Sequence, residues 1–381
     1  MDAYQKTIQE LLAHAGICVN GAAQYDIQVK DHRFYKKVLS EGSLGLGEAY
    51  MDGWWECEAL DEFFNKLLRA KLHQKVKGNL KMFWQGIKAK LFNLQSITLA
   101  KNTIVQHYNI GNTLYEKMLD KYMMYSCAYW EEARDLDEAQ EKKLELICRK
   151  LKLSAGMRVL DIGCGWGGFA TYAARNYQVE VVGLTLSEKQ AELAKVRCRG
   201  LDVEIRLQDY REVNESFDRV LSIGMMEHVG LKNHRKYMEV VNKNLKDGGI
   251  SLLHTIGKYA TFEVTDPWID KYIFPNSLIP SAAQLTKAME GYFHIEDWHN
   301  FGLYYDNTLM AWLDRFKAAW DSIKEHYDHR FYRMWQYYLS CSAGSFRARQ
   351  NHLWQIVMVK DTFKGEYKAV RSLCQDQIGV K

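Results

Sequence analysis

The stretch VLDIGCGWGG, Val159–Gly168, combines a short apolar run, an aspartate and a loop with four glycines. An apolar run that stops at a glycine loop is typical of a buried strand followed by a helix, whose first N–H groups are free to face a ligand. Glycine has no Cβ, so Gly163, Gly165 and Gly167 let the backbone approach that ligand closely. The stretch therefore predicts a nucleotide or nucleoside site on a strand–loop–helix unit.

Asp161 indicates which kind of ligand this loop accepts. The glycine spacing formally matches the dinucleotide fingerprint, which requires an acid at the tip of the next strand, about 20 residues on. That tip reads VVGLTLS, Val181–Ser187, and has no acid. At an effective dielectric constant of about 20, a carboxylate would repel a pyrophosphate by a few kcal/mol, but it would attract an amino group. The pattern favours a zwitterionic ligand and resembles motif I of the S-adenosylmethionine-dependent methyltransferases, with an ordinary structural turn as the alternative.

Alternating strand and helix patterns surround the glycine loop. A long helix is expected at Leu136–Leu153. The expected strands are Arg158–Ile162, Val179–Leu184, Val203–Gln208, Arg219–Met225, Ile250–His254, Phe293–His299 and Leu353–Lys360, of which the last two are expected to be antiparallel. This alternation predicts an α/β fold with a doubly wound, mainly parallel sheet. A smaller, mainly helical N-terminal domain is expected to precede it.

Length and composition restrict the class of protein. The chain has 381 residues, which is more than a typical domain with a single hydrophobic core contains, so one large domain or two domains are expected. No run approaches about 20 uninterrupted apolar residues, and the polar residues scattered through Met1–Gly16 argue against a signal peptide. The eight cysteines include no CxxC pair and give no zinc or disulfide spacing. We therefore expect a cytoplasmic protein with reduced thiols and no metal site.

The N-terminal third contains a strongly basic segment. Between Lys66 and Lys101 there are nine Lys or Arg residues and no acid, interleaved with apolar residues at mostly helical spacing. Such a face suits anionic lipid headgroups, although a solvated helix beside a core has the same pattern. The net charge is only +4 and no recognition motif is present, so no nucleic acid is expected as a partner. The prediction is a membrane-binding domain at 1–90, a linker at 91–104 and a catalytic domain at 105–381.

Six motifs, in order, carry a specific family resemblance. They are HYNIGN, YSCAYW, VLDIGCGWGG, VVGLTLSEKQ, MMEHVG and LLHTIG, beginning at His107, Tyr125, Val159, Val181, Met225 and Leu252. Together they resemble the bacterial cyclopropane-fatty-acyl-phospholipid synthases and, more distantly, the mycolic acid cyclopropane synthases. The N-terminal EGSLGLGEAYMDGWWE, Glu41–Glu56, is similar to the phospholipid enzymes only.

This resemblance implies a fold and an activity. The fold would be that of a class I S-adenosylmethionine methyltransferase. The enzyme would transfer the methyl of S-adenosylmethionine to a cis double bond of an unsaturated phospholipid acyl chain, and loss of a proton would close a cyclopropane ring. It would work as a homodimer, peripheral on the inner face of the membrane.

The resemblance also implies which residues bind the methyl donor. Tyr125 and Ser126 would contact its methionyl part, with Gly163 and Gly165 beside them. Two polar residues would bind the ribose in place of the usual acid, namely Thr185 and Gln190. Three consecutive residues would lie beside the adenine: Asp209, Tyr210 and Arg211, with Tyr210 where a relative has tryptophan.

A second set of residues would hold a bicarbonate ion, which family members use as the base. Glu227 and His254 each end a predicted strand, at the edge where open α/β sheets place their sites. Tyr305 and the backbone near Cys127 and Ile256 would complete the ion site. From the residues alone, a hydrogen-bonded core histidine and a glutamate paired with an arginine are the more ordinary interpretations.

Other features leave alternatives open. Aromatic residues make up 13% of the chain and are dense between Trp298 and Tyr338. Their faces can stabilise a carbocation by about 0.5–2 kcal/mol each, although core packing explains them as well. Relatives carry a cysteine two residues before Gly344, where this chain has Ser342 beside Cys341, so the resemblance assigns neither a role. The rival functions are a small-amine or sterol methyltransferase and a non-catalytic membrane-binding protein.

Overall fold

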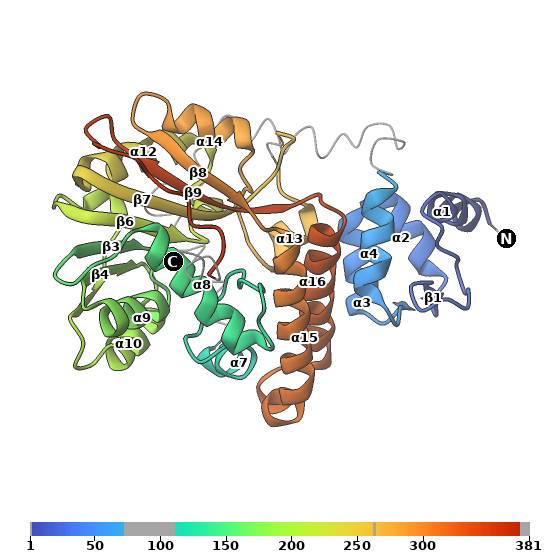
Figure 1. The fold of residues 1–381 in the computed structure, drawn as a ribbon. Helices are drawn as coiled ribbons and strands as arrows, with labels where there is room; N and C mark the ends of the chain where they lie inside the picture. Colours follow the sequence, from blue (N-terminus) through green and yellow to red (C-terminus); the bar gives the residue numbers. More distant parts are fainter. Residues whose placement is uncertain (1, 72–110, 262–263, 374–381) are drawn as a thin grey trace, which may run out of the picture. The chain divides into compact units, whose positions relative to one another are not determined.

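The computed structural model describes residues 2–71, 111–261 and 264–373, whose fold is drawn in Figure 1. Their contacts divide them into two units. The first contains residues 2–71, 264–275 and 305–351, and the second contains residues 111–261, 276–304 and 352–373. The predicted boundary at 105 does not follow these units, because two later segments group with the N-terminal helices. The predicted linker and most of the basic segment lie outside the described residues.

Seven strands form the central sheet of the second unit, in the order β5-β4-β3-β6-β7-β9-β8. Their bounds are β3 (Arg158–Ile162), β4 (Glu180–Thr185), β5 (Val203–Leu207), β6 (Phe217–Ile223), β7 (Leu245–Gly257), β8 (His294–Asn300) and β9 (His352–Val359). The strands β3 to β7 pair in parallel, and β9 is antiparallel to both β7 and β8. The predicted α/β fold with antiparallel final strands is confirmed. The chain order reverses at β3, which opens a crevice at the carboxyl ends of β3 and β6.

Helices cover both faces of this sheet, because successive residues of a strand point to opposite faces. Val159 packs on the face covered by α8 (Leu136–Lys150), α9 (Gly168–Tyr177) and α10 (Glu188–Arg197). Leu160 packs on the face covered by α12 (His234–Asn244) and α14 (Ala282–Met289). The unit also contains α7 (Asn112–Met118), α11 (Met226–Val229) and short 3-10 turns at Tyr210–Glu212 and Leu231–Asn233. The strand ends are thus held between two apolar layers.

The first unit is mainly helical. Its elements are α1 (Ala3–Ala13), α2 (Arg33–Glu41), α3 (Ser43–Met51), α4 (Leu60–Arg69), α13 (Pro267–Tyr272), most of α15 (Leu303–Ile323), a 3-10 turn at Lys324–His326, α16 (His329–Arg347) and the ribbon of β1 (Gln28–Val29) and β2 (Trp55–Glu56). Helix α16 crosses α4 closely at Gly344, where an added Cβ would lie 2.6 Å from the Asp61 carbonyl oxygen. Arg333 of α16 donates to the carbonyl oxygens of Tyr50 at 2.5 Å and Trp55 at 3.1 Å.

No helix within the described ranges is long and apolar enough to cross a bilayer.

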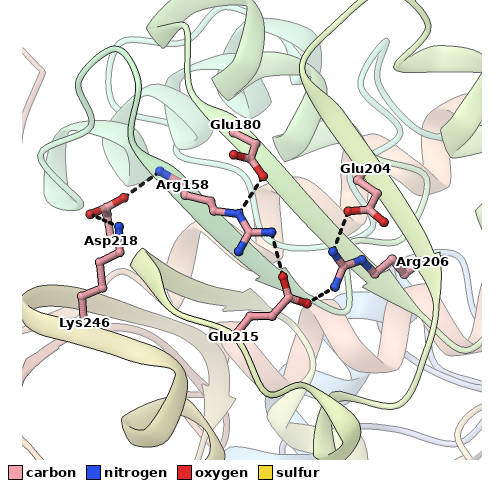
Figure 2. Close-up of polar contacts among 7 residues, drawn as sticks. All are labelled: Arg158, Glu180, Glu204, Arg206, Glu215, Asp218 and Lys246. Carbon is pink, nitrogen blue, oxygen red and sulfur yellow. Dashed lines mark hydrogen bonds and ion pairs between the residues drawn. The ribbon is translucent and has the colours of Figure 1, made fainter.

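An ion-pair network joins the amino ends of the parallel strands (Figure 2). The Arg158 guanidinium donates to Glu180 at 2.6 Å and to Glu215 at 2.8 Å. Glu215 also pairs with Arg206, which bonds Glu204 at 2.6 Å. The network lies at the opposite ends of the strands from the crevice, so its contribution is to stability rather than to ligand binding.

Replacing Glu215 by Gln should lower the free energy of unfolding by about 1 kcal/mol at pH 7, because two partly exposed ion pairs are weakened. Hydrogen bonds from Arg206 and then Arg158 hold the pKa of Glu215 below its ordinary value. Their stabilisation is therefore present above the pKa of the unfolded chain, about 4.3, and is lost as the pH falls through the lower folded value. Urea unfolding at pH 7 and pH 3 measures this.

The control for this prediction is Glu192→Gln, which changes an exposed glutamate of α10 outside the network. Its stability should match that of the unmodified chain at both pH values. A Glu215→Gln protein as stable as this control at pH 7 would show that the network contributes nothing.

Candidate active site

The loop between β3 and α9 forms one wall of a pocket at the carboxyl ends of the strands. Gly163, Gly165 and Gly167 have φ angles of 84°, 56° and 77°. The N–H groups of Gly163 and Cys164 donate to the Leu184 carbonyl at 3.0 and 2.8 Å, which fixes the loop against the end of β4. An added Cβ at Gly165 would meet no atom within 4 Å. The backbone at Gly165 is therefore open to a ligand.

One pocket gathers every residue predicted to bind the cofactor except Gly167. These residues are Tyr125, Ser126, Asp161, Gly163, Gly165, Thr185, Gln190, Asp209, Tyr210 and Arg211. An added Cβ at Gly167 would instead lie 3.0 Å from the Cys198 sulfur and 3.3 Å from Ala194 of α10. Gly167 thus packs the loop against α10, and its place beside the ligand stays a prediction.

Asp161 is the buried acid of this pocket. Its side chain is 2% exposed, and burial alone raises the pKa of the carboxyl to about 7. No charge or hydrogen bond of the described residues offsets this cost. A cationic ligand group would stabilise the carboxylate and lower its pKa again. The pocket therefore fits a ligand with an ammonium or sulfonium group, as S-adenosylmethionine has.

Neutral polar groups lie at the end of β4, where a dinucleotide site would have an acid. The Thr185 hydroxyl donates to Oε1 of Gln190 at 2.9 Å and accepts from the Ser187 N–H at 3.2 Å. The Ser187 hydroxyl in turn accepts from the Gln190 N–H at 3.3 Å and caps α10. The cap fixes Gln190 at the pocket, where its amide nitrogen can donate to a ribose hydroxyl.

The turn after β5 presents an aromatic ring and an ion pair. Arg211 donates to both carboxylate oxygens of Asp209, at 2.8 and 2.6 Å. The Tyr210 ring is 7% exposed and lies 5.6 Å from the Tyr237 ring. The flat, mostly buried face of Tyr210 suits stacking against a base, whereas both oxygens of Asp209 already accept bonds from Arg211.

Two buried polar side chains lie near the carboxyl ends of β6 and β7, one after β6 and the other within β7. Glu227, on α11, accepts a 2.6 Å hydrogen bond from the Ile256 N–H through Oε1. His254, on β7, is 0% exposed, and its Nδ1 lies 3.3 Å from the amide nitrogen of Gln355. Within the described part of the chain, Oε2 of Glu227 and Nε2 of His254 are buried and have no hydrogen-bond partner. Buried polar atoms ordinarily have a hydrogen-bond partner, so these two atoms are candidates for contact with a ligand.

Burial also determines the charges of this pair. It raises the pKa of Glu227 to about 7, and it lowers the pKa of His254 well below its ordinary value. His254 is therefore neutral at pH 7. When Nδ1 accepts from the Gln355 amide, the proton of the neutral ring is on Nε2, which can then donate to a ligand oxygen.

The structure shows contacts for the three other predicted members of the ion site, namely Ile256, Cys127 and Tyr305. The Ile256 N–H donates to Glu227, and the role of the backbone near Ile256 in the ion site stays a prediction. Cys127 is 0% exposed and its thiol donates to the Ala128 carbonyl at 3.3 Å. Tyr305 belongs to the first unit, where its ring lies 4.6 Å from that of Phe346. The roles of Cys127 and Tyr305 stay predictions.

The pocket contains further residues that no motif assigned to it. Trp166 lines it and donates from its indole to the Asn112 side chain at 3.1 Å. Gly168 begins α9, and an added Cβ there would overlap the Tyr122 carbonyl oxygen. His228 also lines it, with a pKa lowered to about 4 by burial. Trp166 and Gly168 lie inside the glycine stretch, but only their contacts reveal what they do.

Comparisons with known proteins agree with this geometry. Residues 95–356 match the family model described as mycolic acid cyclopropane synthetase. The cyclopropane-fatty-acyl-phospholipid synthase of Escherichia coli K12 is 54% identical over 364 residues, which is 96% of this chain and 95% of that protein. The motifs that carry the family resemblance therefore belong to a similarity that extends along nearly the whole chain.

Solved structures give the same fold. The cyclopropane synthase MmaA2 of Mycobacterium tuberculosis aligns with a TM-score of 0.66 and 28% identity, over 71% of this chain and 100% of that one. The mycolic acid cyclopropane synthase CmaA1, solved with S-adenosylhomocysteine, aligns with a TM-score of 0.64 over 68% and 98%. Coclaurine N-methyltransferase, at 21% identity and a TM-score of 0.69, shares the fold alone. The predicted class I methyltransferase fold is confirmed.

Proposed function

The chain belongs to the mycolic acid cyclopropane synthetase family, and we propose that it methylates a cis double bond in an acyl chain of membrane phospholipid and closes a cyclopropane ring there. S-adenosylmethionine supplies an electrophilic methyl group on a sulfonium sulfur. The observation that carries the proposal is the 54% identity, over 96% of the chain, with a cyclopropane-fatty-acyl-phospholipid synthase.

Coverage favours a phospholipid over a mycolate as the substrate. The mycolic acid cyclopropane synthase CmaA1 aligns over 98% of its own length but only 68% of this chain. The phospholipid enzyme of E. coli aligns over 96% of this chain. The part of this chain that lies outside the alignment with CmaA1 is therefore largely shared with the phospholipid enzyme of E. coli. This supports phospholipid as the substrate class here.

The chemistry requires positioning and the exclusion of water. An alkene is a weak nucleophile, and holding it against the methyl group can supply about 7–11 kcal/mol of the acceleration. The resulting carbocation would be quenched by water, which a closed pocket excludes. Glu227 and His254 hold a bicarbonate ion that supplies the base, a proposal supported by their two buried, unpartnered atoms within the described residues.

Labelled S-adenosylmethionine and vesicles of unsaturated phospholipid test the activity. Saponification should release labelled cyclopropane fatty acid from vesicles whose acyl chains contain a cis double bond. Vesicles of fully saturated phospholipid are the control and should remain unlabelled. Label transferred to a small amine or a sterol, with none in the acyl chains, would favour a different methyltransferase, and failure to bind S-adenosylmethionine would favour a non-catalytic membrane protein.

We also propose that the enzyme is a homodimer, peripheral on the inner face of the cytoplasmic membrane, with anionic lipid favoured. The basic segment between Lys66 and Lys101 supports the membrane contact. Each Lys or Arg near an anionic surface contributes about 1 kcal/mol at modest salt. Sedimentation velocity tests the dimer, and a monomer at micromolar concentration would contradict it.

Changing Lys75, Lys77 and Lys81 together to Gln should weaken binding to anionic vesicles and flatten its dependence on salt. Removing three charges near the surface removes a few kcal/mol of attraction, which is about a hundredfold in affinity. Co-sedimentation with vesicles containing phosphatidylglycerol at 50 and 300 mM salt measures this.

A matched triple change, Lys189, Lys195 and Lys232 to Gln, removes the same charge from exposed positions of the second unit. This control should bind vesicles like the unmodified chain. If both triple variants bind vesicles as the unmodified chain does, the basic segment is a solvated helical face and not a membrane contact.

A further inference from the structure

Helix α8 buries two lysines, and one of them contacts the pocket. Lys143 and Lys150 are both 0% exposed. The ammonium nitrogen of Lys143 lies 2.9 Å from the hydroxyl oxygen of Ser126, which lines the pocket. Lys150, two turns further along α8, lies instead 3.3 Å from Asp297 and 3.1 Å from His299. Burying a lysine is costly, so the position of Lys143 needs an explanation.

The segment around Ser126 is held from several sides. Gln140, one turn before Lys143, donates to the carbonyl oxygens of Met124 at 3.2 Å and Ser126 at 2.9 Å. The Asp120 carboxylate accepts from the N–H groups of Tyr122 at 2.7 Å and Met124 at 2.8 Å. These bonds already fix the backbone. The contact of Lys143 with the Ser126 side chain therefore does something besides shaping the loop.

A protonated lysine sets the direction of the Ser126 hydroxyl. An ammonium group can only donate, so the Ser126 oxygen accepts from Lys143. The Ser126 proton then needs an acceptor elsewhere, and no described residue accepts it. Since Ser126 lines the pocket, the pocket is where a ligand acceptor can meet this proton.

We propose that Lys143 is a positioning residue for the methyl donor, which directs the Ser126 hydroxyl into the pocket to bind the carboxylate of the methionyl group. The inference rests on the proposed function, because it assumes that this pocket holds S-adenosylmethionine. In this arrangement the positive and the negative end of the zwitterionic methionyl group each have a partner. Asp161 faces the cationic end, and Ser126, backed by the charge of Lys143, faces the anionic end.

The protonation of Lys143 links this arrangement to pH. Burial lowers the pKa of Lys143 to about 7, against the opposing effects of Asp120 and Cys127. His254 of β7 is the other titratable group that its charge affects. A neutral Lys143 can accept from Ser126, which turns the hydroxyl away from the ligand. Affinity for the carboxylate should therefore fall as the pH rises through about 7, where Lys143 loses its proton.

Two ligands that differ in the methionyl carboxylate and amine test the proposal. Calorimetry gives the dissociation constants of S-adenosylhomocysteine, which carries both groups, and 5′-methylthioadenosine, which carries neither, at pH 6 and pH 8. Lys143→Met should weaken S-adenosylhomocysteine about tenfold or more at pH 6, the loss expected for a charge-assisted hydrogen bond. It should leave methylthioadenosine unchanged and remove the loss of affinity that comes from deprotonating Lys143 between pH 6 and pH 8, so that only the effect of Asp161, whose pKa is also raised to about 7, remains.

Lys150→Met is the matched control, because it removes a second buried lysine of the same helix that contacts no residue of the pocket. It should leave both dissociation constants and the pH difference as they are. Ser126→Ala provides a second route that keeps α8 intact. It should weaken S-adenosylhomocysteine as Lys143→Met does, and adding Lys143→Met to it should cause no further loss.

Several results would overturn the proposal. Equal weakening of both ligands by Lys143→Met would mean that the lysine only supports the fold, as would additive losses in the double variant. An unchanged affinity for S-adenosylhomocysteine in Ser126→Ala would show that the hydroxyl does not bind the ligand. This result would hold even if Lys143→Met failed to fold. An unmodified chain that binds neither ligand would contradict the proposed cofactor site itself, which distinguishes the two failures.

Discussion

Replacing Glu227 by Gln should lower turnover by roughly a hundredfold or more, the usual contribution of a positioned acid or base. Affinity for S-adenosylmethionine should stay near that of the unmodified chain. Oε1 of Glu227 is bonded to the Ile256 N–H at 2.6 Å, while Oε2 is buried without a partner in the described part of the chain. The amide keeps the shape but replaces the anionic acceptor that would hold the hydrogen of bicarbonate.

The variant should lose its response to bicarbonate together with its turnover. Activity of the unmodified chain should fall in carbonate-free buffer and recover when bicarbonate is added, whereas Glu227→Gln should respond little. Glu239→Gln, an exposed change on α12, is the control and should behave like the unmodified chain.

The pH profile gives a second measure of Glu227. Burial raises the pKa of this carboxyl to about 7, so it is protonated below that pH and ionised above it. If the carboxylate is the active form, the rate should fall as the pH drops below about 7. This fall in rate at low pH should be absent from Glu227→Gln, because an amide does not titrate.

The rival base is His254 acting alone. When its Nδ1 accepts from the Gln355 amide, the ring proton is on Nε2, which then has no lone pair for a substrate proton. Under the rival mechanism, removing dissolved carbonate leaves activity untouched. A rate that does not fall in carbonate-free buffer, after the ion has been shown to leave the purified protein, would therefore refute the bicarbonate proposal.

Replacing Gly165 by Val should raise the dissociation constant of S-adenosylhomocysteine by at least about a hundredfold. The φ angle at Gly165 is 56°, a conformation that strains a β-branched residue by about 1–3 kcal/mol. An added Cβ would meet no protein atom within 4 Å, so the valine side chain would extend into the space of the ligand. Vesicle binding should stay intact.

Gly156→Val separates the two effects at Gly165. Gly156 has a φ of 79°, and an added Cβ there also meets nothing within 4 Å, but it lies in the turn before β3 and not in the pocket. Both variants should lose stability, and only Gly165→Val should lose the ligand. Undiminished affinity in Gly165→Val, or an equal loss in both, would contradict the assignment of the glycine loop.

Local sequence patterns were enough to predict the order and type of the strands. The apolar run and the glycines of VLDIGCGWGG predicted a strand, a loop and a helix, and β3 does end at Ile162 and α9 begin at Gly168. The pattern missed the start of β7, which is Leu245 rather than Ile250. Residues 246–249 read KDGG and resemble a turn, but Leu245 pairs with Phe217 of β6, with a register shift before the next pair. Pairing with a neighbouring strand overrides local preference at such a position.

The two adjacent lysines of α8 show what local patterns leave open. Lys142 and Lys143 look alike in the sequence KKLEL, yet Lys142 reaches backbone carbonyls at 131 and 132, while Lys143 is fully buried beside Ser126. Helical periodicity tells which residues share a face, but it does not tell what covers that face. Burial, and with it the pKa of Lys143, depends on the loop that contains Ser126, 17 residues earlier in the chain.

The same distinction applies to the whole molecule. Strand order, the acid of the glycine loop and the residues at strand ends follow from segments of a few residues, because backbone periodicity and turn chemistry act over that range. The grouping of residues 305–351 with N-terminal helices and the bond between Glu227 and the Ile256 N–H required the folded chain. Contacts between distant segments depend on how their side chains pack together, and no single segment contains that information.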